Sequence, residues 1–378
     1  MQYPEEELIG ILKKARVDFT SSVPCEKIKY LLELVGRDFF HVPLTREEEG
    51  VGISAGAALS DKRPAMFVQS SGVGNMINAL LSLTGFYKLP LAIFVSQRGV
   101  YKEKIEAQLP MGKRLPLILR GAGIAYSTIS SRDDFRIIVK KLKEVYSKGG
   151  MHVFLLSPAI WEAGHGAESK VQSVFGNTSA SPGSSLKSVS PNLTRFEILQ
   201  AIAPYLDKKV VVCNLGIPSK ELFFLKHQPS NFYMLGSMGM VTPIGLGISL
   251  TTDKKVVVID GDGSLLMNPG VLATAAHFSP DNLTIIAIDN GAYGSTGNQP
   301  TLTTSCVDLS LVAKGFGIRN VIKSAGRKEL AFVLRSKRKE LRFLHVMAVP
   351  GNRDVPNIPL HHLENKQQVQ EFLTGKNR

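Results

Sequence analysis

The sequence of 378 residues contains only three cysteines, one tryptophan and no long hydrophobic run. Cys25, Cys213 and Cys306 have no CxxC spacing, which argues against a disulfide framework or a zinc site and predicts buried, reduced thiols. No apolar stretch approaches the roughly 18 residues of a membrane span. The N-terminal MQYPEEELIGILKK also lacks the basic and then apolar order of a signal peptide. We therefore expect a cytoplasmic protein without a membrane partner.

Acidic residues are fewer than basic ones, 32 against 45, and the formal net charge is +13. Such an excess suits nucleic acids and small anionic ligands alike. The basic residues are spread along the chain except in RKELAFVLRSKRKELR, where Leu330, Val333, Leu334 and Leu341 have near-helical spacing and predict a helix with a solvated basic face. Because the chain has no basic motif interleaved with aromatic residues, we expect no nucleic-acid partner.

The alternation of short β-branched runs with longer helical patterns is typical of βαβ units and parallel sheets. The strand candidates are PAMFVQSS, LPLAIFVSQRG, MHVFLLSP, KKVVVCNLG, NFYMLGS, KKVVVIDGDG, NLTIIAIDN and FLHVMAVP. Residues 164–192 are rich in Gly, Ser and Pro, which predicts a linker. We expect two α/β domains, 1–163 and 193–378, each a parallel sheet flanked by helices. No internal repeat is visible as sequence identity.

Polar residues follow two successive strand candidates of the second domain. Asp262 lies between two glycines after one strand, and the next strand ends at Asp289 and Asn290. Ligands gather at the carboxyl ends of strands in open α/β sheets, and a helix N-terminus there favours phosphate. Mg²⁺ prefers hard oxygen donors completed by phosphate oxygens. The predicted protein ligands of a Mg²⁺ ion are Asp262, Asn290 and one carbonyl, that of Gly291 or Ala292.

The GDG motif with Asn290, 28 residues after Asp262, resembles the metal and diphosphate motif of the thiamine diphosphate (ThDP) enzymes. The resemblance implies two ThDP-binding-fold domains and two cofactors, ThDP and Mg²⁺. Its cofactor-binding residues would be Gly261, Asp262, Gly263, Ser264 and Asn290, with Gly216 and Ser219 of LGIPSKELF, and Gly236, Ser237 and Met238 of LGSMGM. Met238 would be the wedge under a bent cofactor, and the Gly236 carbonyl would hold its 4′-amino group.

The same family requires a glutamate that hydrogen-bonds N1′ of the aminopyrimidine and so activates C2 of the thiazolium. In TREEEGVGISAGAAL, aligning the family's glutamate and the glycine nine residues later implies Glu47, with Gly56 as the matched glycine. The segment also fits a capping box from Thr45 to Glu48, and both readings can hold. The choice of Glu47 over Glu48 or Glu49 rests on the resemblance.

Within this family the chain resembles the sulfopyruvate decarboxylases, with REEEGVGISAGAAL and QSSGVGNMINALLSL like their α chain and LGIPSKELF, NFYMLGSMGM and DNGAYGSTGNQPT like their β chain. The implied reaction is decarboxylation of 3-sulfopyruvate to sulfoacetaldehyde and CO2, a step of coenzyme M biosynthesis in methanogens. Phosphonopyruvate decarboxylases share several of these segments and are the alternative. A related 2-oxo acid decarboxylase and a non-catalytic ThDP-binding partner subunit are also kept open.

The implied substrate is a small anionic 2-oxo acid, which needs cationic and amide donors. Arg98 in SQRGVYKEK follows a first-domain strand and is the best candidate to bind its sulfonate or carboxylate, although a solvated loop arginine is the alternative. Weaker candidates are Gln69, Ser70, Ser71, Asn75 and Gln299. In this family the two domain types of different chains face each other, so the resemblance implies a homodimer or homotetramer.

Overall fold

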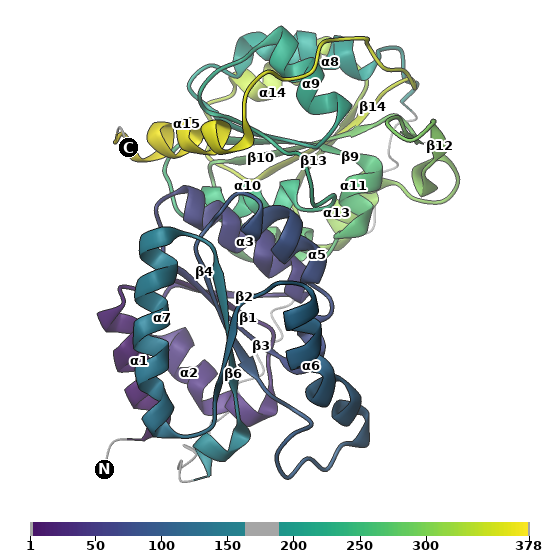
Figure 1. Cartoon of the computed structure of the whole chain (residues 1–378). Coiled ribbons are helices and arrows are strands. Elements are labelled where there is room, and N and C mark those ends of the chain that lie inside the picture. Colours follow the sequence, from purple (N-terminus) through teal and green to yellow (C-terminus); the bar gives the residue numbers. More distant parts are fainter. Residues whose placement is uncertain (1–2, 163–188, 377–378) are drawn as a thin grey trace. The chain divides into compact units, whose positions relative to one another are not determined.

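The computed structural model describes residues 3–162 and 189–376, and the chain divides into two compact units, Met1–Gly176 and Asn177–Arg378 (Figure 1). Each unit contains a six-stranded sheet in which all neighbouring strands are parallel. The prediction of two α/β domains with parallel sheets is therefore confirmed. Of the predicted linker 164–192, residues 164–188 lie outside the described residues.

The first unit has the strand order β2-β1-β3-β4-β6-β5. Its strands are β1 (Phe19–Ser22), β2 (His41–Pro43), β3 (Pro64–Gln69), β4 (Leu91–Ser96), β5 (Tyr126–Ile129) and β6 (Met151–Leu156). Helices α1 (Pro4–Lys14), α2 (Lys29–Asp38) and α7 (Phe135–Lys148) pack on one face of the sheet. The other face carries α3 (Glu47–Leu59), α4 (Ser70–Val73), α5 (Ile77–Ala79) and α6 (Leu109–Gly121).

The second unit has the strand order β13-β14-β10-β9-β7-β8. These strands are β7 (Val210–Cys213), β8 (Asn231–Tyr233), β9 (Val256–Gly261), β10 (Leu283–Asp289), β13 (Asn320–Ser324) and β14 (Arg342–Met347). Beyond β10, β11 (Ala292–Tyr293) and β12 (Gln299–Pro300) form a short antiparallel ribbon. One face of the main sheet carries α8 (Arg195–Ile202), α9 (Ile217–Leu225) and α14 (Arg327–Arg335). The remaining helices are α10 (Val241–Ser249), α11 (Asp262–Met267), α12 (Val271–Phe278), α13 (Leu309–Gly315) and α15 (His362–Thr374).

The two main sheets share one topology. If the strands of each sheet are numbered in chain order, both read 2-1-3-4-6-5, because β8 and β7 correspond to β2 and β1. In both units the chain therefore changes direction across the sheet between the first and third strands. Ligands bind at such switch points in open α/β sheets, at the carboxyl ends of the strands. The topology thus gives each unit one favoured site, at β1 and β3 or at β7 and β9.

Three phenylalanines form the centre of the first unit's core. Phe67, Phe94 and Phe154 lie opposite one another on β3, β4 and β6, and all three are fully buried. Their ring centroids are 5.1 Å apart for the first pair and 4.9 Å for the second. Each ring of this size buries roughly 150–250 Å² of surface. This stack joins β3, after which the segment SSGVGN begins, to β4 and β6.

Four main-sheet strands were not predicted from the sequence, namely β1, β2, β5 and β13. Their sequences, FTSS, HVP, YSTI and NVIKS, are short and contain polar residues, so they lack the apolar run that marks a buried parallel strand. These segments become strands because they pair with neighbouring strands of the sheet. No helix in the described ranges is long and apolar enough to cross a membrane.

Two smaller predictions from the sequence were wrong. The basic helix ends at Arg335, so Leu341 lies outside it, buried in the approach to β14. Leu330, Val333 and Leu334 do lie on its buried side. Cys25 and Cys213 are buried and free as expected, but Cys306 is free and exposed.

Replacing Phe94 by alanine should remove the central ring of the stack and leave a cavity between β3, β4 and β6. We expect a loss of about 3–5 kcal/mol in the free energy of unfolding, measured by urea denaturation. Val139→Ala in α7, where the side chain is 53% exposed, is the control and should change stability by less than about 0.5 kcal/mol. Equal effects of the two substitutions would contradict the assignment of the core.

His152 predicts a pH dependence of stability. It lies on β6, is 5% exposed and has Nε2 2.9 Å from Ser127 Oγ. Burial lowers its pKa to about 4, whereas an unfolded histidine titrates near 6.5. The unfolded chain therefore binds the extra proton first, so stability falls as pH drops from about 6.5 towards 4, by on the order of 3 kcal/mol at most. His152→Gln should flatten this slope in denaturation curves, and an unchanged slope would contradict the shift.

Candidate functional site

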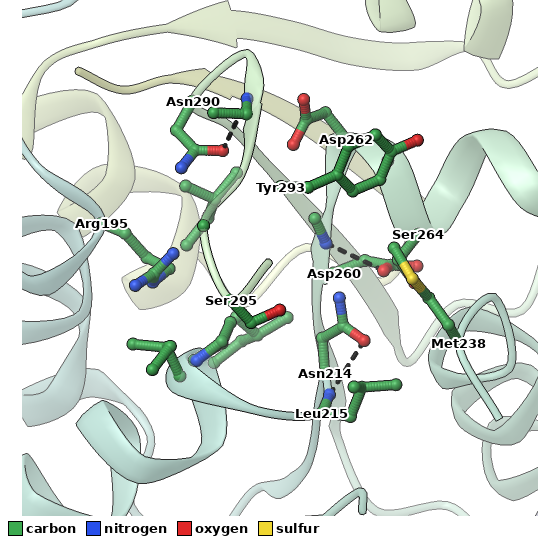
Figure 2. A pocket seen from close by; sticks show the side chains of 18 residues that line it. Arg195, Asn214, Leu215, Met238, Asp260, Asp262, Ser264, Asn290, Tyr293 and Ser295 are labelled. Carbon is green, nitrogen blue, oxygen red and sulfur yellow. Dashed lines mark hydrogen bonds between the residues drawn. The ribbon is translucent and has the colours of Figure 1, made fainter. Parts of the chain in front are cut away.

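A pocket lies at the carboxyl ends of β7, β9 and β10 in the second unit (Figure 2). It occupies the switch point between β7 and β9, where the topology favours a ligand. Its lining includes several residues that the sequence analysis selected, namely Met238, Gly261, Asp262, Gly263, Ser264, Asn290 and Ala292. The structure thus brings the GDG, DNG and GSMG segments together around one hollow.

Asp262 is the first residue of α11 and is only 3% exposed. Its Oδ2 accepts a hydrogen bond from the hydroxyl of Thr301, and the Thr303 hydroxyl lies 3.2 Å from the same oxygen. Burial raises the pKa of its carboxyl group to about 6, although the bond from Thr301 opposes the shift. A carboxylate that is costly to ionise in a pocket is one that a divalent cation would stabilise by displacing its proton.

A second carboxylate, Asp289, lies behind the first. Thr303 Oγ1 donates to its Oδ1 at 2.8 Å, and His345 Nε2 lies 2.8 Å from its Oδ2. The backbone N–H of Ser310 is shared between Asp308 Oδ1, at 2.8 Å, and His345 Nδ1, at 3.3 Å; the tautomer with the ring proton on Nε2 donates to Asp289. Although burial works in the opposite direction, the bonds from His345 and Thr303 lower the pKa of Asp289. Asp289 is therefore held as an anion.

Asn290 and Ala292 complete the candidate metal ligands. Asn290 is 7% exposed, and among the described residues its Nδ2 has no hydrogen-bond partner. A buried, unpaired amide that lines a pocket is costly unless a ligand satisfies it. The Ala292 carbonyl accepts one bond, from the Gly294 N–H at 3.1 Å, and keeps a second lone pair. One carboxylate, one amide and one carbonyl fit Mg²⁺ completed by phosphate oxygens.

Among the described residues no cluster of three or more His, Cys, Asp or Glu side chains is arranged to hold a metal. The candidate donor set does not require one, because only one of its three protein groups is a carboxylate. The fit to Mg²⁺ rests on the oxygens of Asp262, Asn290 and Ala292, and the unpaired N–H donor on Asn290 Nδ2 suits a phosphate oxygen.

Gly263 shows why the motif needs its second glycine. A Cβ atom at this position would lie 2.3 Å from Cε1 of Tyr293, whose ring packs against the start of α11. Tyr293 lies beside Asp262 in the pocket (Figure 2). Sequence reasoning did not select Tyr293, because this ring contact bridges segments that are separate in the chain.

Two further lining residues were also missed. Asn214 directly follows β7, and its Oδ1 accepts from the Leu215 N–H at 2.9 Å. The rule that found Asp262, a polar residue at the carboxyl end of a strand, would have found Asn214 as well. No sequence pattern of this kind marks Arg195, because it lies at the start of α8 and not at the end of a strand.

The GSMG segment enters the site through Met238, which lines the pocket, whereas Gly236 and Ser237 do not. Ser237 has φ +58°, a left-handed backbone that a non-glycine residue adopts at a cost and that is common at functional sites. The N–H of Gly239 donates to Ser264 Oγ at 3.2 Å, which ties this segment to α11. The strained turn therefore presents Met238 to the pocket.

Gly216 and Ser219 lie outside this pocket. Gly216 precedes α9 with φ +79°, and the hydroxyl of Ser219 donates to the carbonyl of Asn214 at 2.7 Å. Both residues line a separate hollow next to Tyr233 and Asn365. Any contribution of Ser219 to cofactor binding would act through the connection between β7 and α9.

In the first unit, Glu47 begins α3 and is 7% exposed. Asn75 Nδ2 donates to its Oε2 at 3.0 Å. A Cβ atom on Gly72 would lie 2.2 Å from Glu47 Oε1, so the glycine in SSGVGN makes room for this carboxylate. Two segments that were selected separately, TREEEG and SSGVGN, therefore form one local site around Glu47.

The capping box expected from Thr45 to Glu48 does not form. Arg46 is the N-cap of α3, and the Thr45 hydroxyl donates to Oε2 of Glu49 at 2.5 Å. Glu48 instead lies 3.8 Å from the Arg46 guanidinium. The three glutamates thus have different surroundings, and Glu47 is the one in contact with SSGVGN.

Arg98, the best substrate candidate from the sequence, is committed to an ion pair. It is buried, and its Nε and Nη2 donate to Glu103 at 2.6 and 2.7 Å. The hydrogen bond from Arg98 holds the pKa of Glu103 near 2, well below its usual range. The guanidinium charge is therefore neutralised within the chain.

The weaker substrate candidates differ in availability. Ser70 donates its hydroxyl to the Ser96 carbonyl at 3.2 Å. Gln69 is half-buried and Ser71 is exposed, both at the start of α4. Gln299 belongs to the second unit, is exposed, and bonds to Thr296 at 2.8 Å. Only Asn75, through Glu47, is tied to a predicted catalytic group.

The chain was compared with known proteins. The family model for the C-terminal TPP-binding domain of thiamine pyrophosphate enzymes matches residues 220–346. The sulfopyruvate decarboxylase of Methanosarcina acetivorans is 42% identical, and the match covers 99% of this chain and 98% of that protein. A phosphonopyruvate decarboxylase of Streptomyces viridochromogenes is 31% identical over 92% of this chain and 89% of its own length.

The subunits of a split enzyme match parts of the chain. The β subunit of the sulfopyruvate decarboxylase of Methanococcus maripaludis is 44% identical over 48% of this chain and 98% of its own length. The α subunit from the same organism is 40% identical over 39% of this chain and 89% of its own length. Among solved structures, benzoylformate decarboxylase from Polynucleobacter necessarius has a TM-score of 0.70 over 94% of this chain and 100% of that chain. At 14% identity, that likeness shows the fold alone.

Proposed function

The chain belongs to the sulfopyruvate decarboxylase family of ThDP-dependent carboxy-lyases, and we propose that it converts 3-sulfopyruvate to sulfoacetaldehyde and CO2. The observation that carries the proposal is the 42% identity to a sulfopyruvate decarboxylase over nearly the whole length of both proteins. The site residues support it independently, because one pocket joins the buried carboxyl of Asp262 to the unpaired amide donor of Asn290. By the same likeness we propose a role in coenzyme M biosynthesis in the cytoplasm.

We assign the cofactor site to the pocket of the second unit. Asp262, Asn290 and the Ala292 carbonyl would bind Mg²⁺, and the free N–H groups at the start of α11 would face the diphosphate. Met238 would support the bent cofactor. ThDP, when bound, supplies the electron sink for the electrons released as CO2 leaves. The protein contributes binding, orientation and exclusion of water.

Glu47 is the proposed proton-transfer group. Its carboxyl would share a proton with N1′ of the aminopyrimidine, and Asn75 and Gly72 fix its position, one by a hydrogen bond and the other by close contact. A carboxylate with one fixed oxygen and little solvent contact needs little reorganisation when the proton moves. That arrangement favours catalysis by Glu47 over Glu48, which is near Arg46, and over Glu49, which is bonded to Thr45.

The substrate would be recognised by neutral donors. Glu103 neutralises Arg98. We therefore propose that the carboxylate and sulfonate of the substrate are contacted by Gln69, Ser71 and Gln299, and by the amide N–H of Asn75 that does not bond to Glu47. Arg98 would instead shape the loop that follows β4. By the likeness to the separate α and β subunits of sulfopyruvate decarboxylases, we propose that the working enzyme is a homodimer or a homotetramer in which different chains supply these residues.

The proposed reaction is tested by measuring CO2 release from 3-sulfopyruvate with and without ThDP and Mg²⁺, beside phosphonopyruvate and pyruvate at the same concentrations. We expect the sulfonate to have the highest kcat/KM. A higher kcat/KM for phosphonopyruvate would favour the activity named for the 31% identical relative. ThDP binding without turnover of any 2-oxo acid would indicate a non-catalytic partner subunit.

Replacement of Glu47 by glutamine should leave ThDP bound and lower kcat by about 10²–10⁴, the range for one positioned proton-transfer group. Glu48→Gln and Glu49→Gln are matched controls in the same turn of α3. Turnover should be measured at saturating ThDP and Mg²⁺, with binding followed by calorimetry. A normal kcat in the Glu47 variant with loss of activity at Glu48 or Glu49 would move the assignment to that position.

Replacement of Asp262 by asparagine should weaken Mg²⁺-dependent ThDP binding by about 10- to 100-fold, because the shell loses its only charged protein oxygen. The metal-free variant should be at least as stable as the wild type, since a buried carboxyl is removed. Asp281→Asn, at a side chain that is 56% exposed, is the control. Titrations of ThDP at fixed Mg²⁺ check this, and an unchanged affinity would contradict the metal assignment.

A further inference from the structure

Three side chains from distant parts of the second unit meet behind the loop 291–298. Arg195 of α8 and Glu221 of α9 are 7% and 0% exposed, and they form a two-bond ion pair at 2.8 and 3.0 Å. Arg195 Nη2 also donates to Asn352 Oδ1 at 2.9 Å. The surface residue Asn352 is thereby connected to a buried ion pair.

The other end of the Asn352 amide reaches the cofactor pocket. Its Nδ2 donates to the carbonyl of Gly294 at 2.7 Å. Gly294 lies two residues after Ala292, whose carbonyl is a proposed Mg²⁺ ligand, and both residues line the pocket. Figure 2 shows Arg195 and Met238 on opposite sides of that pocket. A continuous chain of bonds thus runs from Glu221 through Arg195 and Asn352 to the pocket wall.

Two contacts that do not involve the Asn352 side chain bring these residues together. The Val349 N–H donates to the Leu193 carbonyl at 2.8 Å, so the entry to α8 lies beside the segment that follows β14. The N–H of Arg353 donates to Glu221 Oε1 at 3.0 Å. The backbone therefore positions Asn352 whether or not its side chain bonds to Gly294. The bond to the Gly294 carbonyl restricts the position of the loop 291–298.

A buried ion pair is weak evidence of stability, because removing both charges from water costs about as much as their attraction returns. What the pair does supply is orientation. The guanidinium fork, fixed at two points by Glu221, offers its remaining Nη2 proton in one direction only, and this selects one orientation of the Asn352 amide. That orientation turns the amide N–H towards Gly294.

We propose that Asn352 is a positioning residue for the Mg²⁺–diphosphate site, fixed by Arg195 and Glu221 and acting through the Gly294 carbonyl on the loop 291–298, which carries Ala292 and directly follows Asn290. The inference rests on the proposed function of that pocket. It concerns the affinity for a diphosphate and its divalent cation rather than the chemical step at the other end of the cofactor.

Asn352→Asp tests the proposal, because the aspartate keeps the acceptor for Arg195 but places an oxygen against the Gly294 carbonyl. Asn352→Ala removes both bonds without adding charge. Asn357→Asp, at another exposed asparagine of the same segment, adds the same charge away from Gly294. ThDP binding at fixed Mg²⁺, the KM for ThDP, kcat at saturation and hydrogen exchange of amides 291–298 should be measured in the full chain.

We expect both Asn352 variants to bind ThDP about 3- to 10-fold more weakly, the effect of one lost hydrogen bond. Their amides 291–298 should exchange faster without cofactor, and kcat at saturation should stay within about twofold of the wild type. Asn357→Asp should match the wild type. Weaker ThDP binding in Asn352→Asp alone would be an effect of charge and would overturn the proposal. If the wild type is active, unchanged ThDP binding in both Asn352 variants would also overturn it. A wild type that binds no ThDP would contradict the proposed function itself.

Discussion

The burial of Asp262 at the carboxyl end of β9 is the constraint on which the second unit's site depends. An ionised carboxylate in this position is costly, and burial raises its pKa to about 6. The chain offsets part of that cost with the hydroxyls of Thr301 and Thr303, which lie beyond the loop 291–298. For these hydroxyls to reach Asp262, the chain must leave β10, form the loop 291–298 and turn back towards the start of α11. The same turn back of the chain, closed also by the β11–β12 ribbon and by the bond from the Thr301 N–H to the Gly291 carbonyl, presents Ala292 to the pocket.

Asp289 shows how the same sheet edge gives two carboxyls different states. It lies one strand away and is as buried as Asp262, yet its pKa is lowered because His345 and Thr303 donate to it. The two carboxyl groups differ in pKa only because their surroundings differ, and proteins commonly give similar groups different roles in this way. The anion that is already satisfied stays in the wall as structure. Asp262, which burial makes costly to ionise, lines the pocket, where a cation would stabilise its negative charge.

Sequence patterns predicted those site residues that are marked by their immediate neighbours in the sequence. A polar residue between glycines after an apolar strand indicated Asp262, and the end of the next strand indicated Asn290. Patterns failed where contacts are distant: Arg195 and Asn352 are 157 positions apart, and nothing near either residue predicts the other. Arg98 is a different case, because its partner Glu103 stands only five residues away in QRGVYKE and a buried pair could have been considered. The short strands β1, β2, β5 and β13 escaped detection because pairing, not composition, makes them strands.

The shared strand order of the two units explains why fold alone could not assign their roles. In both, the third strand ends in a short helix, α4 after β3 and α11 after β9. The sequences at these matching positions are SSGVG and DGSLL. Each uses a glycine to admit another side chain, since Gly72 makes room for Glu47 and Gly263 for Tyr293. Only the second places a carboxyl on the first turn, so only there does the switch point suit a cation. The proton-transfer group proposed for the first unit, Glu47, begins α3, whereas the metal ligand proposed for the second, Asp262, begins α11, so one scaffold would carry two different roles.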